Sequence, residues 1–505
     1  MTNIDYDTSA FTEWVEEQTG INLEFVLFPA VTTESLQQFT LMANGNEKLP
    51  DVLWTVMGWN VESIYELGNQ GYLVDLRELI ENYAPNYKAA LAKRTQGDQD
   101  RINTVGTSSI DGGFYALPFN RYPSTMQGQS TMLINQKWLD AVGKEVPTTI
   151  EELYEVLEAF ANEDPNGNGK KDEIPMVGTA REILGYIANA YTYINMDPKQ
   201  AYWLNVDENG KLYSAYTSDA YREALKIMAD MTEKGYINTQ TYALEDYPVL
   251  KNITSNPSTT ECIVGITASP SNAFNTGDLR LTEYVPMYEL EAELEGGGYY
   301  VKQPPTLYWP GSITKDCENP ELAMQLLDFL CSDDAIARAT FGIYGTDWQF
   351  VEGRSFENAE SGDLIVDASL SAGKNLSELN RHWGGRTSGV LNSYNSIAVT
   401  IPSGDEWRDH QATLINAFKT HSGEADAPEK VIIELVYTEE ENEIISASKT
   451  LLTERFVEAT AQFATGVLDP NSDADWKTYL DSVEDIGLTD FLKVAQQAYD
   501  RANGR

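Results

Sequence analysis

The sequence predicts an α/β protein with more than one domain. Amphipathic helices alternate with short apolar strand runs, and no segment repeats, which favours helices layered on sheets over a solenoid or an all-β sandwich. The length of 505 residues, at about 150 residues per domain, predicts two to four domains. The hydrophobic fraction of 42% is enough to fill their cores, so wholesale disorder is excluded.

The apolar spacing predicts the elements in chain order. In the first eighty residues helices are expected at about 8–19, 33–44, 61–69 and 76–82, and buried strands at 23–28 and 50–54. Thr148 or Thr149 caps a further helix, with a glutamate three residues later to reach back. Pro320 behind Asn319 suits a first helical position. The C-terminal third is expected to be mostly helical, over 429–466 and 489–502.

The charge of the chain excludes two classes of partner. Lys and Arg number 35 against 78 Asp and Glu, a net charge of −43. Nucleic acid and anionic lipid both need clusters of Lys and Arg to neutralise phosphate, so no nucleic-acid binding is expected. The chain also lacks a run of about 20 apolar residues, the length that spans a bilayer.

Few of the residues used in catalysis are present, and we expect no enzyme. The three histidines do not have the spacing of a zinc site, and the three cysteines are odd in number and contain no CxxC pair. No nucleophile elbow, phosphate loop or dinucleotide fingerprint is present. A glycoside hydrolase would use two carboxylates, but nothing singles out a pair among so many. The histidines and cysteines are His382, His410, His421, Cys262, Cys317 and Cys331.

The most specific motif is the segment from Asp164 to Glu173, which predicts a Ca2+ site. Oxygen-bearing side chains alternate there around a glycine, as in a calcium loop, although Pro175 stands where an EF-hand has its last glutamate. The alternative is a plain Asn/Asp/Gly turn. A similar segment, 469–475, lacks the glycine and is read as a helix-capping turn. The predicted ligands are Asp164, Asn166, Asn168, the Lys170 carbonyl, Asp172 and Glu173.

A second set consists of aromatic and polar residues in loop-like positions after strands. Aromatic faces beside hydrogen-bonding side chains suit sugar rings, and open α/β sheets bind ligands at the carboxyl ends of strands. Each tryptophan taken alone is better explained as a core residue, whereas the set as a whole favours a sugar-binding surface. The candidates are Trp54, Trp59, Asn120, Arg121, Tyr122, Trp309, Trp383 and Arg386.

With these residues, the chain resembles the family 1 extracellular solute-binding proteins of bacterial ABC importers, in their large form with a calcium loop. The most specific stretches are 11–20, 49–54, 164–175 and 313–321. The calcium segment is similar to that of alginate-oligosaccharide-binding proteins. The resemblance implies a substrate-binding component that captures an oligosaccharide and hands it to permease subunits; the alternatives are a carbohydrate-binding surface protein and a glycoside hydrolase.

The resemblance also implies a two-lobed, periplasmic-binding-protein-like α/β fold with a helix-rich C-terminal part. With hinge crossings near Thr131, Thr306 and Asp367, the N-terminal lobe takes 1–130 and 307–366. The C-terminal lobe takes 131–306 and 367–505 and contains the calcium loop. Ligand would bind in the cleft between the lobes, which close by hinge bending. In this expectation Trp383 and one of Trp54 or Trp59 face each other from opposite lobes.

The same resemblance implies an extracytoplasmic, monomeric protein, lipid-anchored to the outer face of a Gram-positive cell membrane. A signal segment and a lipid-bearing cysteine are not seen in this chain. Arg121, Arg381 and Arg386 could pair with a uronate carboxylate, or each could form a structural ion pair. The net charge of −43 disfavours steering of an anionic ligand, so neutral oligosaccharides are favoured.

Overall fold

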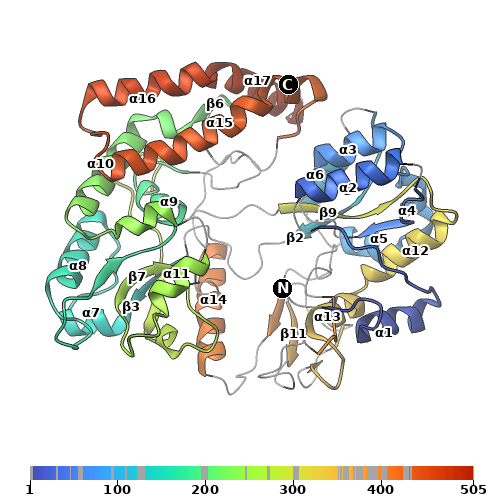
Figure 1. Ribbon diagram of the computed structural model, residues 1–505, viewed down its shortest axis with the longest axis horizontal. Helices are drawn as coiled ribbons and strands as arrows, with labels where there is room; N and C mark the ends of the chain where they lie inside the picture. The colour runs from blue at the N-terminus through green and yellow to red at the C-terminus, as the bar shows by residue number, and fades with distance from the viewer. Residues whose placement is uncertain are drawn as a thin grey trace. The chain divides into compact units, whose positions relative to one another are not determined.

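The protein consists of two compact units, seen here in a computed structural model (Figure 1). The first unit contains Met1–Ser124, Pro305–Gly404 and Val436–Glu439, and the second contains Thr125–Pro304, Asp405–Leu435 and Glu440–Arg505. The structure describes residues 4–29, 32–45, 47–54, 61–92, 96–108, 111–121, 131–194, 203–244, 247–269, 273–299, 306–350, 352, 355–356, 363–367, 370, 379–383, 396–399, 406–424, 432 and 435–503.

The chain passes between the units five times, whereas three crossings were expected. The units change after Ser124 and after Pro304, close to the expected positions at Thr131 and Thr306. At Asp367, where a third crossing was expected, the chain stays in the first unit until Gly404. Two pairings explain the difference: β11 (Asp363–Asp367) pairs in parallel with β12 (Ser396–Val399) and antiparallel with β10 (Gln349–Phe350). Residues 367–404 therefore lie in the first unit.

The first unit contains a sheet whose central strand comes from far along the sequence. β9 (Thr306–Ile313) pairs antiparallel with both β1 (Val52–Trp54) and β2 (Leu117–Arg121). Leu53, Leu117 and Ile313 of these strands are buried in one core together with Leu327. The helices of this unit are α1 (Ala10–Thr19), α2 (Thr32–Asn44), α3 (Val61–Asn69), α4 (Arg77–Tyr83), α5 (Pro85–Ala92), α6 (Gln96–Gly106), α12 (Pro320–Leu330) and α13 (Asp333–Phe341).

The second unit contains a mixed sheet of order β4-β7-β3-β8. β4 (Ile174–Met176) runs parallel to β7 (Val264–Ala268), while β3 (Met132–Asn135) is antiparallel to β7 and to β8 (Tyr284–Met287). A hairpin, β5 (Leu204–Val206) and β6 (Leu212–Ser214), lies apart from this sheet. The helices are α7 (Gln136–Val142), α8 (Ile150–Asn162), α9 (Ala180–Ala188), α10 (Asp219–Glu233), α11 (Tyr247–Thr254), α14 (Glu406–Glu424), α15 (Glu439–Ala464), α16 (Asp473–Ile486) and α17 (Leu488–Ala502), with short 3-10 turns η2 (Ala215–Thr217), η3 (Thr239–Ala243) and η4 (Leu279–Glu283).

Helices cover both faces of the second unit's sheet. Leu133 of β3 belongs to a buried cluster that also contains Trp407 and Phe418 of α14. Gly265 of β7 lies against Phe160 of α8, whose ring meets Trp138 of α7 edge to face at 5.2 Å between ring centroids. Figure 1 shows α7 and α8 on one side of β3 and β7 and α14 on the other. In the described part of the chain, the helices are all too short or too polar to cross a membrane.

The two predicted capping signals are confirmed. The Thr149 hydroxyl accepts from the Glu152 amide at 3.1 Å, and the Glu152 carboxylate accepts from the Thr148 amide at 2.8 Å. The side-chain oxygen of Asn319 accepts from the Leu322 amide at 3.1 Å at the start of α12. These contacts satisfy amide groups that the first turn of a helix leaves without an intrahelical partner.

Two predicted elements differ from the structure. The segment 23–28 is irregular, not a strand, since no strand among the described residues pairs with it. Its apolar side chains Leu23 and Phe25 pack instead into a cluster with Phe11 of α1. The long C-terminal helix begins at Glu439 and not at 429, a delay of about three helical turns, and the chain at 435–438 is non-helical.

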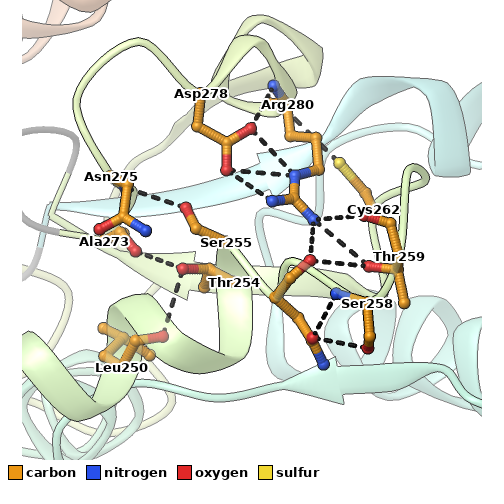
Figure 2. A network of polar contacts seen from close by, with 11 residues as sticks. Leu250, Thr254, Ser255, Ser258, Thr259, Cys262, Ala273, Asn275, Asp278 and Arg280 are labelled. Atoms are coloured by element: carbon orange, nitrogen blue, oxygen red, sulfur yellow. Dashed lines mark hydrogen bonds and ion pairs between the residues drawn. The ribbon is translucent and has the colours of Figure 1, made fainter.

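A polar network around Arg280 holds together the loops before β7 and β8 (Figure 2). Its guanidinium donates to both carboxylate oxygens of Asp278 at 2.7 to 3.1 Å and to the carbonyls of Asn256 at 3.0 Å and Thr259 at 3.3 Å. The Arg280 and Asp278 side chains are only 14% and 13% exposed. Burial alone would raise the pKa of Asp278, but the hydrogen bonds from Arg280 outweigh it and lower that pKa.

We expect Arg280→Ala to destabilise the second unit by about 3 kcal/mol, because it leaves a buried carboxylate without its partner. The matched control is Arg77→Ala. Arg77 pairs with Asp75 at the same spacing in sequence, but its side chain is 60% exposed, so its loss should cost less than about 1 kcal/mol. Urea unfolding of both variants measures the difference. Equal losses would contradict the structural role assigned to Arg280.

Candidate functional site

The predicted calcium loop connects the end of α8 to β4 in the second unit. Gly167 and Gly169 have φ angles of 70° and 72°, a backbone conformation that side chains with a Cβ disfavour. The Gly167 amide donates to the Asp164 carbonyl at 3.1 Å, which closes the first turn of the loop. The two glycines thus let the chain fold back on itself between the oxygen-bearing residues.

Most oxygen-bearing side chains of the loop are engaged within it. The two carboxylate oxygens of Asp164 accept from the amides of Asn168 at 3.1 Å and Gly169 at 2.9 Å. The Asp172 carboxylate accepts from the side-chain amides of Asn166 at 3.3 Å and Asn168 at 3.1 Å. When the side-chain amide of an asparagine rotates, its oxygen and its NH2 group exchange positions. Rotation of Asn166 and Asn168 would therefore place their carbonyl oxygens where their NH2 groups now point.

One carboxylate oxygen of Glu173 is the atom of this loop that lacks a partner. This atom, Oε1, is buried and has no hydrogen-bond donor. Burial, and then the negative charges of Asp172 and Asp164, raise the pKa of the Glu173 carboxyl. A bound cation would relieve both costs, so the donor set fits a hard divalent ion. Among the described residues, no group of three acidic, His or Cys side chains is arranged to hold a metal ion. In this loop, the Asp172 carboxylate is bonded to the side-chain amides of Asn166 and Asn168.

The similar segment 469–475 is a helix-capping turn, as predicted. The Ser472 hydroxyl accepts from the Asp475 amide at 3.2 Å and so caps α16. Arg222 donates to the Pro470 carbonyl at 2.8 Å, and its guanidinium lies 2.9 Å from the Asp473 carboxylate. The positive charge beside the oxygens of this turn is therefore the Arg222 side chain.

Trp54, the last residue of β1, lies in the sheet of the first unit opposite Gly311 of β9. Its ring is half-buried between two apolar clusters, and a side chain at position 311 would meet it. The indole Nε1 is buried without a hydrogen-bond acceptor. Trp54 is thus largely a packing residue, and its polar atom is left without a partner.

The backbone places three other candidates in the same sheet as Trp54. Asn120 and Arg121 of β2 lie opposite Leu307 and Thr306 of β9, and the pairing register shifts at Trp309. Extra residues of this kind in a ladder often mark sites where a strand re-aims a side chain. The side chains of Asn120, Arg121 and Trp309, and the whole of Trp59, Tyr122 and Arg386, fall outside the described residues.

Trp383 is a core residue of the first unit. It is 5% exposed, and its ring meets Phe11 and Phe25 edge to face at 4.9 and 5.4 Å between ring centroids. Its Nε1 donates to the Thr12 hydroxyl at 2.8 Å. Trp383 was expected in the second lobe as a platform for a sugar ring, since it stands in a glycine-flanked loop. The contacts that bury it come from α1, which is far away in the sequence. This geometry gives no support to a platform role.

Arg381, a candidate for a uronate carboxylate, already has a carboxylate partner. Its guanidinium donates to Asp347, whose side chain is fully buried. Asp347 in turn accepts from the Ile343 amide at 2.9 Å. Arg381 therefore forms the structural ion pair that was the alternative for it.

We expect Trp383→Ala to lower the free energy of unfolding of the first unit by about 3–5 kcal/mol, the usual cost of deleting a buried tryptophan ring. Thr12→Val, which removes the hydroxyl that accepts from Trp383 and donates to the Tyr6 carbonyl, should cost less, about 1–2 kcal/mol. Chemical denaturation of the two variants tests this order. Wild-type stability in Trp383→Ala would show that the ring is not part of the core.

Comparison with known proteins indicates the family of the chain, which the geometry of the site alone does not. A family model described as bacterial extracellular solute-binding protein matches residues 3–337. The fructooligosaccharide ABC transporter substrate-binding protein FusA of Streptococcus pneumoniae is 22% identical over 511 residues, covering 96% of this chain and 86% of FusA.

Solved structures show the same fold. An HMO-binding, ABC-transporter-associated solute-binding protein from Bifidobacterium longum infantis superimposes with a TM-score of 0.76 at 19% identity, covering 99% of this chain and 96% of its own. An EF-hand mutant of FusA in complex with fructo-nystose gives 0.72 at 20%, covering 99% and 97%. Alginate-binding protein AlgQ2 without calcium ion gives 0.66 at 21%, covering 98% and 95%. The chain belongs to the family of bacterial extracellular solute-binding proteins.

Proposed function

We propose that this protein captures an oligosaccharide outside the membrane and delivers it to the permease subunits of an ABC importer, without chemistry of its own. The observation that carries the proposal is membership of the solute-binding family, together with the likeness to FusA over 96% of the chain. Two α/β units connected by several chain crossings suit hinge closure on a ligand. We further propose a monomer that is lipid-anchored to the outer face of the membrane.

We propose that the sugar is neutral and that the first unit contacts it through the carboxyl ends of β1 and β2. Trp54, Asn120, Arg121 and Trp309 share the sheet there, which supports a common surface. Trp59, Tyr122 and Arg386 remain part of this proposal. The net charge of −43 disfavours an anionic sugar, and Arg381 is already paired with Asp347.

A thermal-shift screen tests the function. Kestose, neutral milk oligosaccharides, N-glycan oligosaccharides and oligouronates are each added to the purified protein. A sugar at about 100 times its Kd stabilises the folded state by about 2.7 kcal/mol, which should raise the melting temperature by roughly 5 °C or more. Chromatography of the recovered sugar checks that it is uncut.

The proposal predicts a shift with at least one neutral oligosaccharide and none with the oligouronates. A shift with oligouronates alone would overturn the neutral sugar, and cleavage of the sugar would indicate a glycoside hydrolase. No shift with any sugar would contradict oligosaccharide capture.

We propose that the loop 164–173 holds one structural Ca2+. Carboxylates of Asp164, Asp172 and Glu173, amide oxygens of Asn166 and Asn168 and the carbonyl of Lys170 would supply the ligands. The support is the orphaned, buried Oε1 of Glu173 and the raised pKa of its carboxyl. The ion would neutralise these carboxylates and tie the end of α8 to the start of β4.

Chelation tests the calcium site. With Ca2+ at about 100 times its Kd, EDTA should remove about 2.7 kcal/mol of stability from the wild type. Asp164→Ala with Asp172→Ala should melt alike with and without EDTA. The control pair is Asp469→Ala with Asp475→Ala, in the similar turn served by Arg222; it should keep the full EDTA effect. An EDTA effect that survives in the first double variant would contradict the site.

A further inference from the structure

Three segments of the second unit meet at one edge of its sheet. β4 and β7 run parallel, with Ile174 level with Val264, so their carboxyl ends lie side by side. Thr179 follows β4 and Ser269 follows β7. β3 runs the opposite way and begins at this edge, where the Ser269 amide donates to the Thr131 carbonyl at 2.8 Å. Ligands of open α/β sheets bind outside this kind of edge.

A chain of polar side chains surrounds a buried carboxylate there. Glu182, in the first turn of α9, is 2% exposed. Its Oε2 accepts from the Thr179 hydroxyl at 2.8 Å, and its Oε1 accepts from the hydroxyl of Tyr247, the first residue of α11, at 2.9 Å. The Tyr247 hydroxyl is also hydrogen-bonded to Ser269. Both direct partners of this carboxylate are neutral, so its burial costs the fold free energy.

Ser269 adds a second cost at the same edge. It has a φ of 64°, a left-handed conformation in which serine is uncommon. Among the described residues the other non-glycine with positive φ is Asn380, whose side chain bonds the Asp5 carbonyl at 2.9 Å and so holds the N-terminal segment in place. Backbone strain of this kind clusters at ligand-binding sites. At Ser269 the strained residue stands directly after β7, with its amide bonded to the Thr131 carbonyl.

We infer that Tyr247 is a ligand-binding residue of the second unit and that Glu182 and Ser269 are the residues that position it. This inference rests on the proposed function, because its ligand is the oligosaccharide. Tyr247 packs against the core cluster of the second unit but is partly exposed, and we infer that its exposed part contacts the apolar C–H face of a sugar. Its hydroxyl proton is committed to Glu182 and its oxygen is bonded to Ser269, so a sugar hydroxyl would donate to the remaining lone pair of the tyrosine oxygen.

The experiment compares volume-preserving variants with a matched pair elsewhere in the unit. Tyr247→Phe and Glu182→Gln break the network while keeping its shape, and Tyr247→Ala removes the ring. The controls are Tyr154→Phe and Asp230→Asn. Tyr154 donates to the Asp230 carboxylate at 2.7 Å between α8 and α10, a tyrosine–carboxylate pair away from the strand ends in which Lys234 also bonds the carboxylate. Kestose, the neutral milk oligosaccharides and the N-glycan oligosaccharides are titrated by calorimetry, and melting curves are recorded.

Tyr247→Ala should lose at least tenfold in affinity for the sugar that the wild type binds, and Glu182→Gln and Tyr247→Phe should lose at least threefold. Glu182→Gln should melt no lower than the wild type, since it removes a buried charge. Ser269→Gly should melt higher and bind more weakly, because glycine relieves the strain and lacks the hydroxyl. The controls should bind within twofold of the wild type.

The alternative is that the network only fastens α11 to α9. In that case the Tyr247 and Glu182 variants would melt lower and bind the sugar as the wild type does, which would overturn this inference and leave the proposed function intact. A wild type that binds none of the sugars would overturn both.

Discussion

The fold of the first unit depends on one pairing, the insertion of β9 between β1 and β2. β9 comes from residues 306–313, and between β2 and β9 the chain builds residues 125–304 of the second unit. Neither β1 nor β2 pairs with any other described strand, so without β9 the core around Leu53 and Leu117 would lose its sheet. Most of the second unit therefore precedes β9 in the sequence, and the chain must return from the second unit to complete the first.

Local signals in the sequence predicted local structure well. The caps at Thr149 and Asn319 formed as expected, since a cap depends only on residues three positions apart. Features that depend on distant partners were missed. The segment 23–28 has the composition of a strand, but a strand needs a neighbouring strand for its backbone hydrogen bonds. The side chains of this segment pack against helix α1 instead. The burial of Trp383 likewise depends on contacts with α1, hundreds of positions away, and the crossing at Gly404 depends on the pairing of β11 with β12.

The two aspartate- and asparagine-rich segments show why composition alone does not determine a site. In 469–475 an arginine from another helix, Arg222, reaches the carbonyl and carboxylate oxygens. In 164–173, no hydrogen-bond donor among the described residues reaches the buried Oε1 of Glu173. The alternation of oxygen-bearing residues in the sequence drew attention to both segments. The presence or absence of a protein cation beside each could be seen only in the folded chain.

The same reasoning applies to the carboxyl edge of β4 and β7. The sequence marks Thr179 and Glu182 as an ordinary helix start, since threonine followed by glutamate three residues later is a capping box. In the structure that glutamate does not reach back to the cap amide but turns toward a tyrosine hydroxyl of another helix, beside a strained serine. A fold selected only for stability would have an uncharged side chain and a glycine at these positions. The free-energy costs at Glu182 and Ser269 are the observations on which the ligand-binding role inferred for Tyr247 rests.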